Sequence, residues 1–256
     1  MKDIKKELAN YYSQFSNIYS KENYPQWFEF FTQYNHDNNF GDLGYINNRQ
    51  DHELGHYAIF QTPIPELSNP KEKTKIIIVG KNNSWFIPVA RRVKESLEIV
   101  KNLKSGIPSR NLYLEKESKF AKAICSIFSE LGSYDLLEKN TVGMNRIWLQ
   151  TGPDASFIKY MKEERKGASF QEKILGSSLV DICHRWTEEI IELLNPELVL
   201  LLGTNPNGAD NLFSKKEGIY EHANGSFFIK HCRHPSNGGR PETLKHIGEG
   251  LELIGS

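Results

Sequence analysis

The chain has 256 residues, and its 32 lysine and arginine residues balance 32 aspartate and glutamate residues. This length suits one substantial α/β domain or two small ones, and the zero net charge neither indicates nor excludes a nucleic-acid partner. The three cysteines are widely spaced, which argues against a disulfide framework, a zinc ribbon or a four-cysteine iron–sulfur cluster.

The first seventy residues are rich in aromatic and polar side chains. The spacing predicts helices over 2–18 and 24–34, loops over 35–56, and an extended edge segment over 56–65, where the prolines disfavour a central strand. The charged N-terminus lacks the apolar core of a secretory signal, and no apolar run reaches transmembrane length. We therefore expect a cytoplasmic protein in which 1–70 pack as an extension on the main domain.

The strongest strand signal is four β-favouring residues at 76–79, which run into Gly80 and predict a parallel strand covered on both faces. Further strands are predicted over 143–150, 197–208 and 225–236. Helices are predicted over 89–104, 117–131, 169–196 and 240–254. This alternation predicts one domain, 1–256, built as a three-layer α/β/α sandwich around a mostly parallel sheet.

Three segments deliver polar residues to the carboxyl ends of predicted strands: 80–83, 203–205 and 231–236. Ligands of open α/β sheets bind at that edge, so these segments are expected to converge. A phosphate-binding P-loop is excluded because Lys75 and Asn82 stand where its glycine and hydroxyl are needed. Dinucleotide glycine motifs and a serine nucleophile elbow are absent from the sequence. We expect no cofactor and no metal, because the histidines near Cys232 lack the helical spacing of a typical metal site.

Two short motifs, in their order and strand context, resemble those of the uracil-DNA glycosylase superfamily. Its members have roughly Gly-x-(Asp/Asn)-Pro after an inner strand, and His-Pro-Ser near the C-terminus. KIIIVGKNN (75–83) is similar to the first motif, and HCRHPSNGG (231–239) resembles the second. ELVLLLGT (197–204) looks like the strand that leads into the family's Gly-Ser element, and MNRIW (144–148) like the strand that carries its base-reading asparagine.

The resemblance implies that Asn82 positions a water molecule and that His234 donates a hydrogen bond to the departing base, which is anionic. It places Phe86 for stacking on an extruded base and Asn145 for reading the Watson–Crick edge. The implied base-binding residues are Gly80, Lys81, Asn83, Ser84, Phe86 and Asn145. The implied DNA-binding residues are Thr204, Arg233, Ser236, Asn237 and Arg240.

Two departures from the family pattern bear on the substrate. Ser84 stands where uracil enzymes have a tyrosine that excludes 5-substituents, and the wedge after His-Pro-Ser is replaced by Asn237 and glycines, or by Arg240. The resemblance thus implies a monofunctional, monomeric DNA glycosylase that removes a flipped pyrimidine and leaves an abasic site. The base is a 5-modified pyrimidine, such as a hypermodified cytosine of phage DNA removed in defence, or uracil. A non-catalytic nucleic-acid-binding protein of the same fold and a nucleoside or nucleotide hydrolase remain the alternatives.

Overall fold

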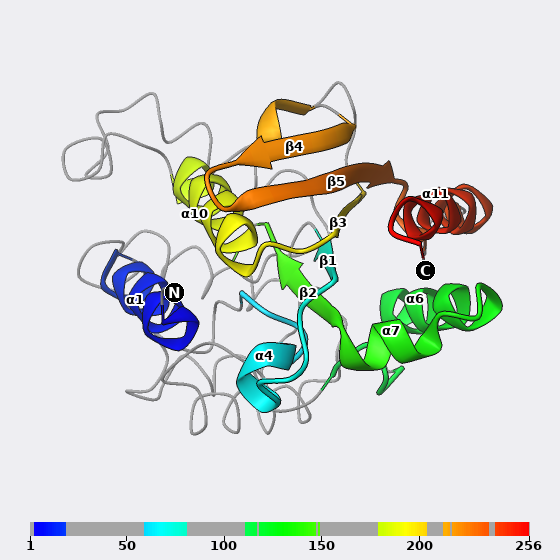
Figure 1. Cartoon of the computed structure of the whole chain (residues 1–256), viewed down its shortest axis with the longest axis horizontal. Helices are drawn as coiled ribbons and strands as arrows, with labels where there is room; N and C mark the ends of the chain where they lie inside the picture. The colour runs from blue at the N-terminus through cyan, green and yellow to red at the C-terminus, as the bar shows by residue number, and fades with distance from the viewer. Residues whose placement is uncertain are drawn as a thin grey trace, which may run out of the picture.

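The computed structural model describes residues 3–18, 59–80, 111–116, 118–146, 148, 179–203, 212–215, 217–235 and 239–255. The helices are α1 (Ile4–Ile18), α4 (Pro65–Ser68), α6 (Lys119–Glu130), α7 (Tyr134–Lys139), α10 (Leu179–Leu194), the 3₁₀ helix η3 (Leu212–Lys215) and α11 (Arg240–Leu253). The strands are β1 (Ile76–Gly80), β2 (Thr141–Asn145), β3 (Leu198–Leu202), β4 (Gly218–His222) and β5 (Gly225–Cys232). Figure 1 shows these strands between two groups of helices.

The described strands form one five-stranded sheet in the order β2-β1-β3-β5-β4. The pairs β1–β2, β1–β3 and β3–β5 are parallel, and only the β4–β5 hairpin is antiparallel. Every residue of β1, β2 and β3 is buried, as expected for parallel strands covered on both faces. The prediction of an α/β protein with a mostly parallel sheet is confirmed.

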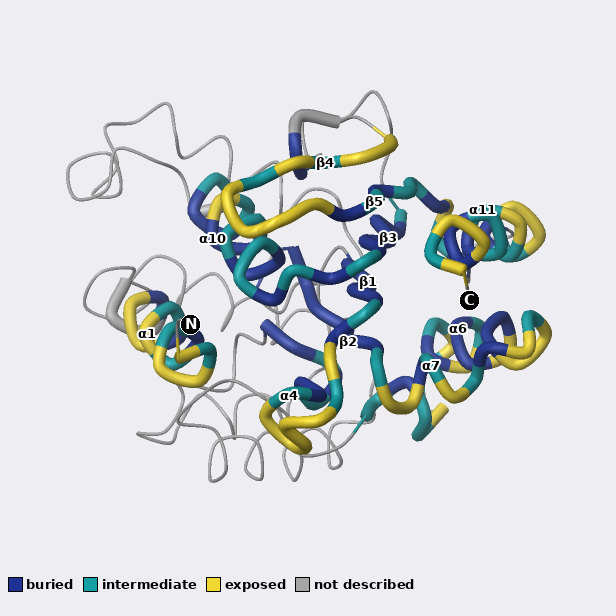
Figure 2. Tube along the Cα trace, viewed as in Figure 1, coloured by how far each residue is buried: buried dark blue, intermediate teal, exposed yellow. Residues whose placement is uncertain are grey.

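Side chains alternate along the strands and feed two separate cores. Ile77, Val79 and Met144 point into the core under α1 and α10. Ile76, Ile78 and Leu200 point the other way, into the core under α6, α7 and α11. Figure 2 shows the exposed residues of the helices turned outward, and it shows β4 and the start of β5 as the exposed part of the sheet. Helices on both faces make the arrangement compatible with a three-layer α/β/α sandwich.

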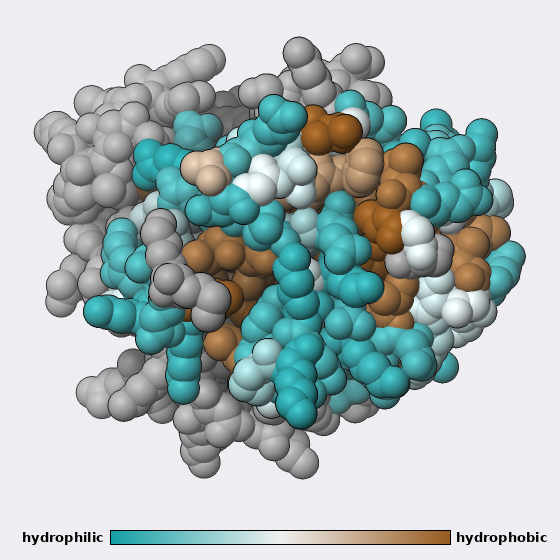
Figure 3. All heavy atoms as spheres, viewed as in Figure 1, coloured by the Kyte–Doolittle hydropathy of each residue, from teal (hydrophilic) through white to brown (hydrophobic). Residues whose placement is uncertain are grey.

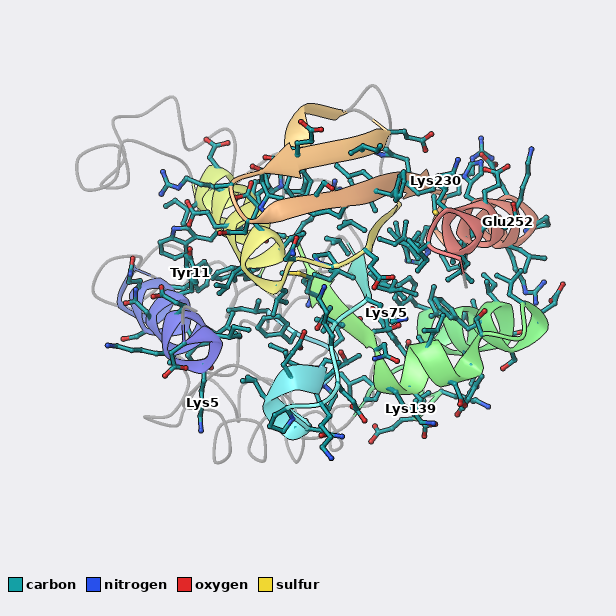
Figure 4. The ribbon with its side chains drawn as sticks, in the orientation of Figure 1. Lys5, Tyr11, Lys75, Lys139, Lys230 and Glu252 are labelled. Carbon is teal, nitrogen blue, oxygen red and sulfur yellow. The ribbon has the colours of Figure 1, made fainter. Side chains whose placement is uncertain are left out.

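Local sequence explains where these helices begin and end. The Ser118 hydroxyl accepts a hydrogen bond from the Ala121 amide at 2.9 Å and caps α6, and Pro241 occupies the first turn of α11. Helix α10 ends at Leu194; the next residue, Asn195, has a φ of 46°, and Pro196 follows it. Tyr11 of α1 lies toward α10 in Figure 4, and its hydroxyl donates to Glu189 at 2.8 Å.

The structure differs from the sequence predictions at the sheet edges. Strand β2 begins at Thr141 rather than at 143, and Trp148 packs in the core, where its indole donates to Thr187 at 3.1 Å. Strand β4 was not predicted; it is the exposed edge strand, and its Ile219 is 65% exposed. On the face seen in Figure 3, hydrophilic residues run through the centre with hydrophobic residues on either side.

Segment 59–62 lies along the outer edge of β2, close to the edge position expected for 56–65. Phe60 forms an antiparallel bridge with Met144. The backbone N–H of Asn145 donates to the Ile59 carbonyl at 2.8 Å, and the backbone N–H of Gln61 donates to the Gly143 carbonyl at 2.7 Å. The predicted helices over 24–34 and 89–104 lie outside the described residues, as do the loops over 35–56 and the first ten residues of the predicted helix 169–196.

Candidate functional site

The carboxyl ends of four parallel strands lie side by side and form one polar edge of the sheet. Asn145 ends β2 beside Gly80, which ends β1. On the far side of β1, the Gly203 amide follows β3 and donates to the Cys232 carbonyl at the end of β5, at 2.9 Å. His234 follows two residues later. We call Gly80, Asn145, Gly203 and His234 the strand-end cluster.

Register places Gly80 and Asn145 on the same face of the sheet. Every second residue of a strand lies on the same face, so Gly80 shares a face with Ile76 and Ile78, which point toward α6 and α11. Asn145 likewise shares a face of β2 with Gly143. A Cβ on Gly143 would lie 2.5 Å from the hydroxyl of Tyr113, which belongs to the same core as Ile76 and Ile78. Both residues therefore face the layer of α6, α7 and α11.

Glycines stand at the ends of β1 and β3, the two strands between Asn145 and His234. A Cβ on Gly80 would lie 3.8 Å from Asn145 Oδ1, and a Cβ on Gly203 would lie 3.5 Å from His234 Cβ and Cδ2. Gly203 also has a φ of +70°, a backbone conformation that residues other than glycine adopt only with strain. At about 4.8 Å per strand spacing, β2 and β5 lie about 14 Å apart.

His234 is half-buried and packs against the ring of Phe120, with centroids 5.0 Å apart and planes inclined at 30°. Burial lowers the pKa of His234 below the ordinary value of 6.5, because water is removed from the charged form. The imidazole is therefore neutral at pH 7. A neutral imidazole offers one N–H donor and one acceptor, which suits hydrogen bonding to a substrate oxygen.

Phe120 is a site residue that sequence reasoning missed. It lies in the first turn of α6, is half-buried, and meets the ring of Tyr113 edge-on at 5.9 Å. Together with the Gly203 backbone it confines the His234 ring. No local pattern marks it, because Phe120 and His234 come together only when α6 packs beside the end of β5.

Asn145 is completely buried, and its Oδ1 accepts a hydrogen bond from Gln61 Nε2 at 2.8 Å. Gln61 is the second residue that sequence reasoning missed. A fully buried amide such as that of Asn145 has its orientation fixed by its hydrogen bonds. The bond to Gln61 therefore holds Asn145 in one arrangement at the edge of the sheet.

The loop that carries His234 is fastened to the start of α11. The buried Thr243 hydroxyl lies 2.7 Å from the Arg233 carbonyl and 2.8 Å from the Gly239 carbonyl. A Cβ on Gly239 would lie 2.8 Å from the His234 carbonyl, so only glycine permits this approach. These contacts give the loop a defined course on both sides of 236–238, which lie outside the described residues.

The two arginines predicted to contact DNA form ion pairs close to this loop. Arg233 is largely exposed and pairs with Glu242 through Nε at 3.0 Å. Arg240 Nη2 lies 2.6 Å from Glu130 Oε2 and 3.0 Å from Ser126 Oγ, which joins α11 to α6. Arg240 therefore makes a structural contact that the sequence did not predict.

The strand-end cluster contains only part of the predicted site. The structure brings Gly80, Asn145 and His234 to one edge, with Arg233 and Arg240 beside the loop. The remaining predicted site residues lie outside the described residues; they are Lys81, Asn82, Asn83, Ser84, Phe86, Thr204, Ser236 and Asn237.

Metal ligands and membrane segments were sought in the part of the chain that the structure describes. No group of three or more histidine, cysteine, aspartate or glutamate side chains is placed there to hold a metal ion. The helices described are all too short or too polar to cross a membrane. Comparison of the sequence with protein-family models finds no match, and a search of curated proteins finds none either.

Proposed function

We propose that this protein is a monofunctional DNA glycosylase with a fold like that of the uracil-DNA glycosylases. It hydrolyses the N-glycosidic bond of a flipped pyrimidine, which is 5-modified or is uracil, and leaves an abasic site. The observation that carries the proposal is the strand-end cluster, in which Asn145 and His234 flank two glycines at one sheet edge. That edge is where α/β sheets bind ligands.

In the proposed reaction, water adds to the C1′ carbon of the sugar while the bond from C1′ to the base nitrogen breaks. The bonding electrons leave with the base, so negative charge develops on its 2-oxygen, and the proton that the water loses ends on the released base. His234 donates a hydrogen bond to this oxygen from its neutral imidazole. A donor held in place in this way contributes about 3–4 kcal/mol to transition-state stabilisation.

Asn145 recognises the base in this proposal. A buried carboxamide carries both a donor and an acceptor, which match the adjacent polar groups on the Watson–Crick edge of a pyrimidine. The resemblance assigns the water to Asn82, whose amide positions a nucleophile but does not remove its proton efficiently. Ser84, in the place of a tyrosine, favours bases that carry a 5-substituent.

DNA reaches the site from the side of the His234 loop. The main-chain and side-chain donors of 203–205 and 233–240 are proposed to hold the phosphates that flank the flipped nucleotide. Arg233 supports this assignment because it is largely exposed and its ion pair with Glu242 lies at the surface. A surface pair of this kind is weak enough to exchange for a phosphate.

The test is release of free base from duplex oligonucleotides, each with one uracil, 5-hydroxymethyluracil or glucosylated 5-hydroxymethylcytosine. Mass spectrometry identifies the base, and alkaline cleavage of the abasic site measures the rate. We expect release of at least one base, and a loss of about 100-fold or more in His234→Ala. Asn82→Ala is expected to be impaired as well.

The matched control is His222→Ala, which removes a histidine from the opposite edge of the sheet and is expected to retain the parent's rate. Failure to release any base contradicts the proposal. Tight, salt-dependent binding to abasic duplex without release would favour the non-catalytic binder. Turnover of free nucleosides or nucleotides in place of duplex would favour the small-molecule hydrolase.

A further inference from the structure

Gln61 comes from a segment that the proposed chemistry does not use, yet it bonds directly to the proposed base reader. Its backbone is fastened on both sides. The backbone N–H of Gln61 donates to the Gly143 carbonyl, and the backbone carbonyl of Gln61 accepts from the Leu112 N–H at 3.0 Å. The neighbouring Thr62 hydroxyl accepts from the Gly143 amide at 2.9 Å. Gln61 is thus held in a fixed place beside β2.

The bond from the Gln61 side chain favours one orientation of the Asn145 amide. The two ends of a carboxamide have nearly the same shape, but one only donates hydrogen bonds and the other only accepts them. Gln61 Nε2 is a donor, and it lies 2.8 Å from Asn145 Oδ1. Reversing the Asn145 amide would bring its NH₂ group against this donor and cost the bond.

The orientation seen places the acceptor end of Asn145 toward the centre of the strand-end cluster. Asn145 Oδ1 is the side-chain atom that a Cβ on Gly80 would meet. Gly80 ends β1, and β3 and β5 follow on the same side. The acceptor therefore lies on the side of the amide nearer to His234.

We propose that Gln61 is a positioning residue that sets the choice between 4-oxo and 4-amino pyrimidines by fixing the Asn145 amide. The inference rests on the proposed function, in which the base is held with its 2-oxygen at His234. N3 of the base then meets the nearer end of the amide, Oδ1, and position 4 meets the farther end, Nδ2. Uracil-type bases have an N3–H donor and a 4-oxygen acceptor, so both contacts are satisfied. Cytosine-type bases have an N3 acceptor and a 4-amino donor, so both contacts are opposed.

The test compares Gln61→Glu with Gln61→Met on duplexes that carry 5-hydroxymethyluracil or 5-hydroxymethylcytosine. A glutamate carboxylate only accepts, so it should draw Asn145 Nδ2 toward itself and reverse the amide. Methionine has a similar length and holds neither end. We expect the ratio of kcat/KM for the 4-oxo base over the 4-amino base to fall by about tenfold or more in Gln61→Glu, with Gln61→Met between it and the parent.

Equal losses on both bases, with the ratio unchanged in both variants, would overturn the inference, since a purely structural residue acts in that way. A second measurement does not depend on activity. The side-chain amide of Asn145 is observed by NMR and assigned from its loss in Asn145→Asp. In Gln61→Glu, one Nδ2 proton should move downfield as it bonds to the carboxylate, and in Gln61→Met it should not.

The two measurements separate failure of the inference from failure of the proposed function. If the parent protein releases no base while the Nδ2 proton shifts as expected, the proposed function fails and the control of Asn145 by Gln61 stands. If base is released while Gln61→Glu and Gln61→Met show the same Nδ2 signal, the inference fails and the glycosylase proposal stands.

Discussion

The parallel strands of the sheet begin at one edge, the amino edge, and end at the opposite one, the carboxyl edge. Each of these two edges carries an asparagine and a histidine, but the two pairs are arranged differently. At the amino edge, Asn195 Oδ1 and His222 Nε2 lie 3.1 Å apart, in hydrogen-bond contact. At the carboxyl edge, Asn145 and His234 belong to strands that are separated by β1 and β3, and glycines occupy the positions between them. The same residue types bond to each other at one edge of the fold and stand on separate strands at the other.

Glycine has opposite roles in these two places. Gly225 lets the β4–β5 hairpin approach Asn195, because a Cβ there would lie 2.8 Å from Asn195 Oδ1. Gly203 keeps a side chain away from the ring of His234. The amino edge is therefore an assembly that holds the hairpin to α10, whereas the carboxyl edge keeps its polar groups apart.

The largest expected effect comes from exchanging these two glycines for alanine. Gly203→Ala strains a backbone with φ +70° and places a methyl group on His234, so we expect a stability loss of about 1–3 kcal/mol and loss of base release. Gly225→Ala strains a φ of +151° and breaks the contact with Asn195, so stability falls by a similar amount. Of the two variants, only Gly225→Ala should keep the parent's rate of base release per folded molecule. Urea unfolding and duplex assays measure both, and equal rates in the two variants would contradict the comparison.

The next effect concerns the ring that supports His234. Phe120→Ala opens the imidazole to water and frees its plane, so the pKa of His234 should rise toward 6.5 and base release should fall by about 10- to 100-fold. Phe120→Tyr keeps the ring and should stay near the parent in both respects. NMR titration of the histidines gives the pKa, and an unchanged His234 midpoint in Phe120→Ala would refute the role of Phe120.

A smaller effect is expected in the pH dependence of stability. The pKa of His234 is lowered by burial, and so is that of His231. Below pH 6.5 the unfolded chain binds protons that the folded chain binds only at lower pH, so the free energy of unfolding falls as the pH falls. His234→Gln should flatten this dependence between pH 7.5 and pH 5 by removing one of the two histidines. A slope as steep as the parent's in urea unfolding would show that His234 is not desolvated.

The smallest effect is expected at Arg240. Its ion pair with Glu130 is partly exposed, so Arg240→Ala should cost at most about 1 kcal/mol of stability. The loss should shrink as salt is added, because screening weakens the parent's ion pair. A large, salt-independent loss measured by urea unfolding would mean that the contact with α6 is far more important than a surface pair.

Much of the sheet is predictable from the sequence, because a buried parallel strand has a distinctive local pattern. The continuous apolar runs that end in Gly80 and Gly203 mark β1 and β3, and both strands lie where those runs predict. Strand β4 escapes the same reasoning, since its exposed alternation resembles a loop. His234 can be located in the sequence because proline and serine follow it in a short motif.

The support of the site is not predictable in this way. Gln61 and Asn145 are 84 residues apart in the chain, and their bond depends on how segment 59–62 lies beside β2. Phe120 likewise reaches His234 only through the packing of α6. Such pairs leave no periodic signal in one sequence, because each residue taken alone is an ordinary polar or aromatic side chain.

The central claim is that Asn145 and His234 contact the same small ring. The most direct measurement is an NMR titration of the protein with free uracil, observing the imidazole of His234 and the side-chain amide of Asn145. We predict that both signals shift with one dissociation constant, while those of His222 and Asn195 at the opposite edge do not move. Shifts at only one of the two residues, or two different dissociation constants, would contradict a shared site.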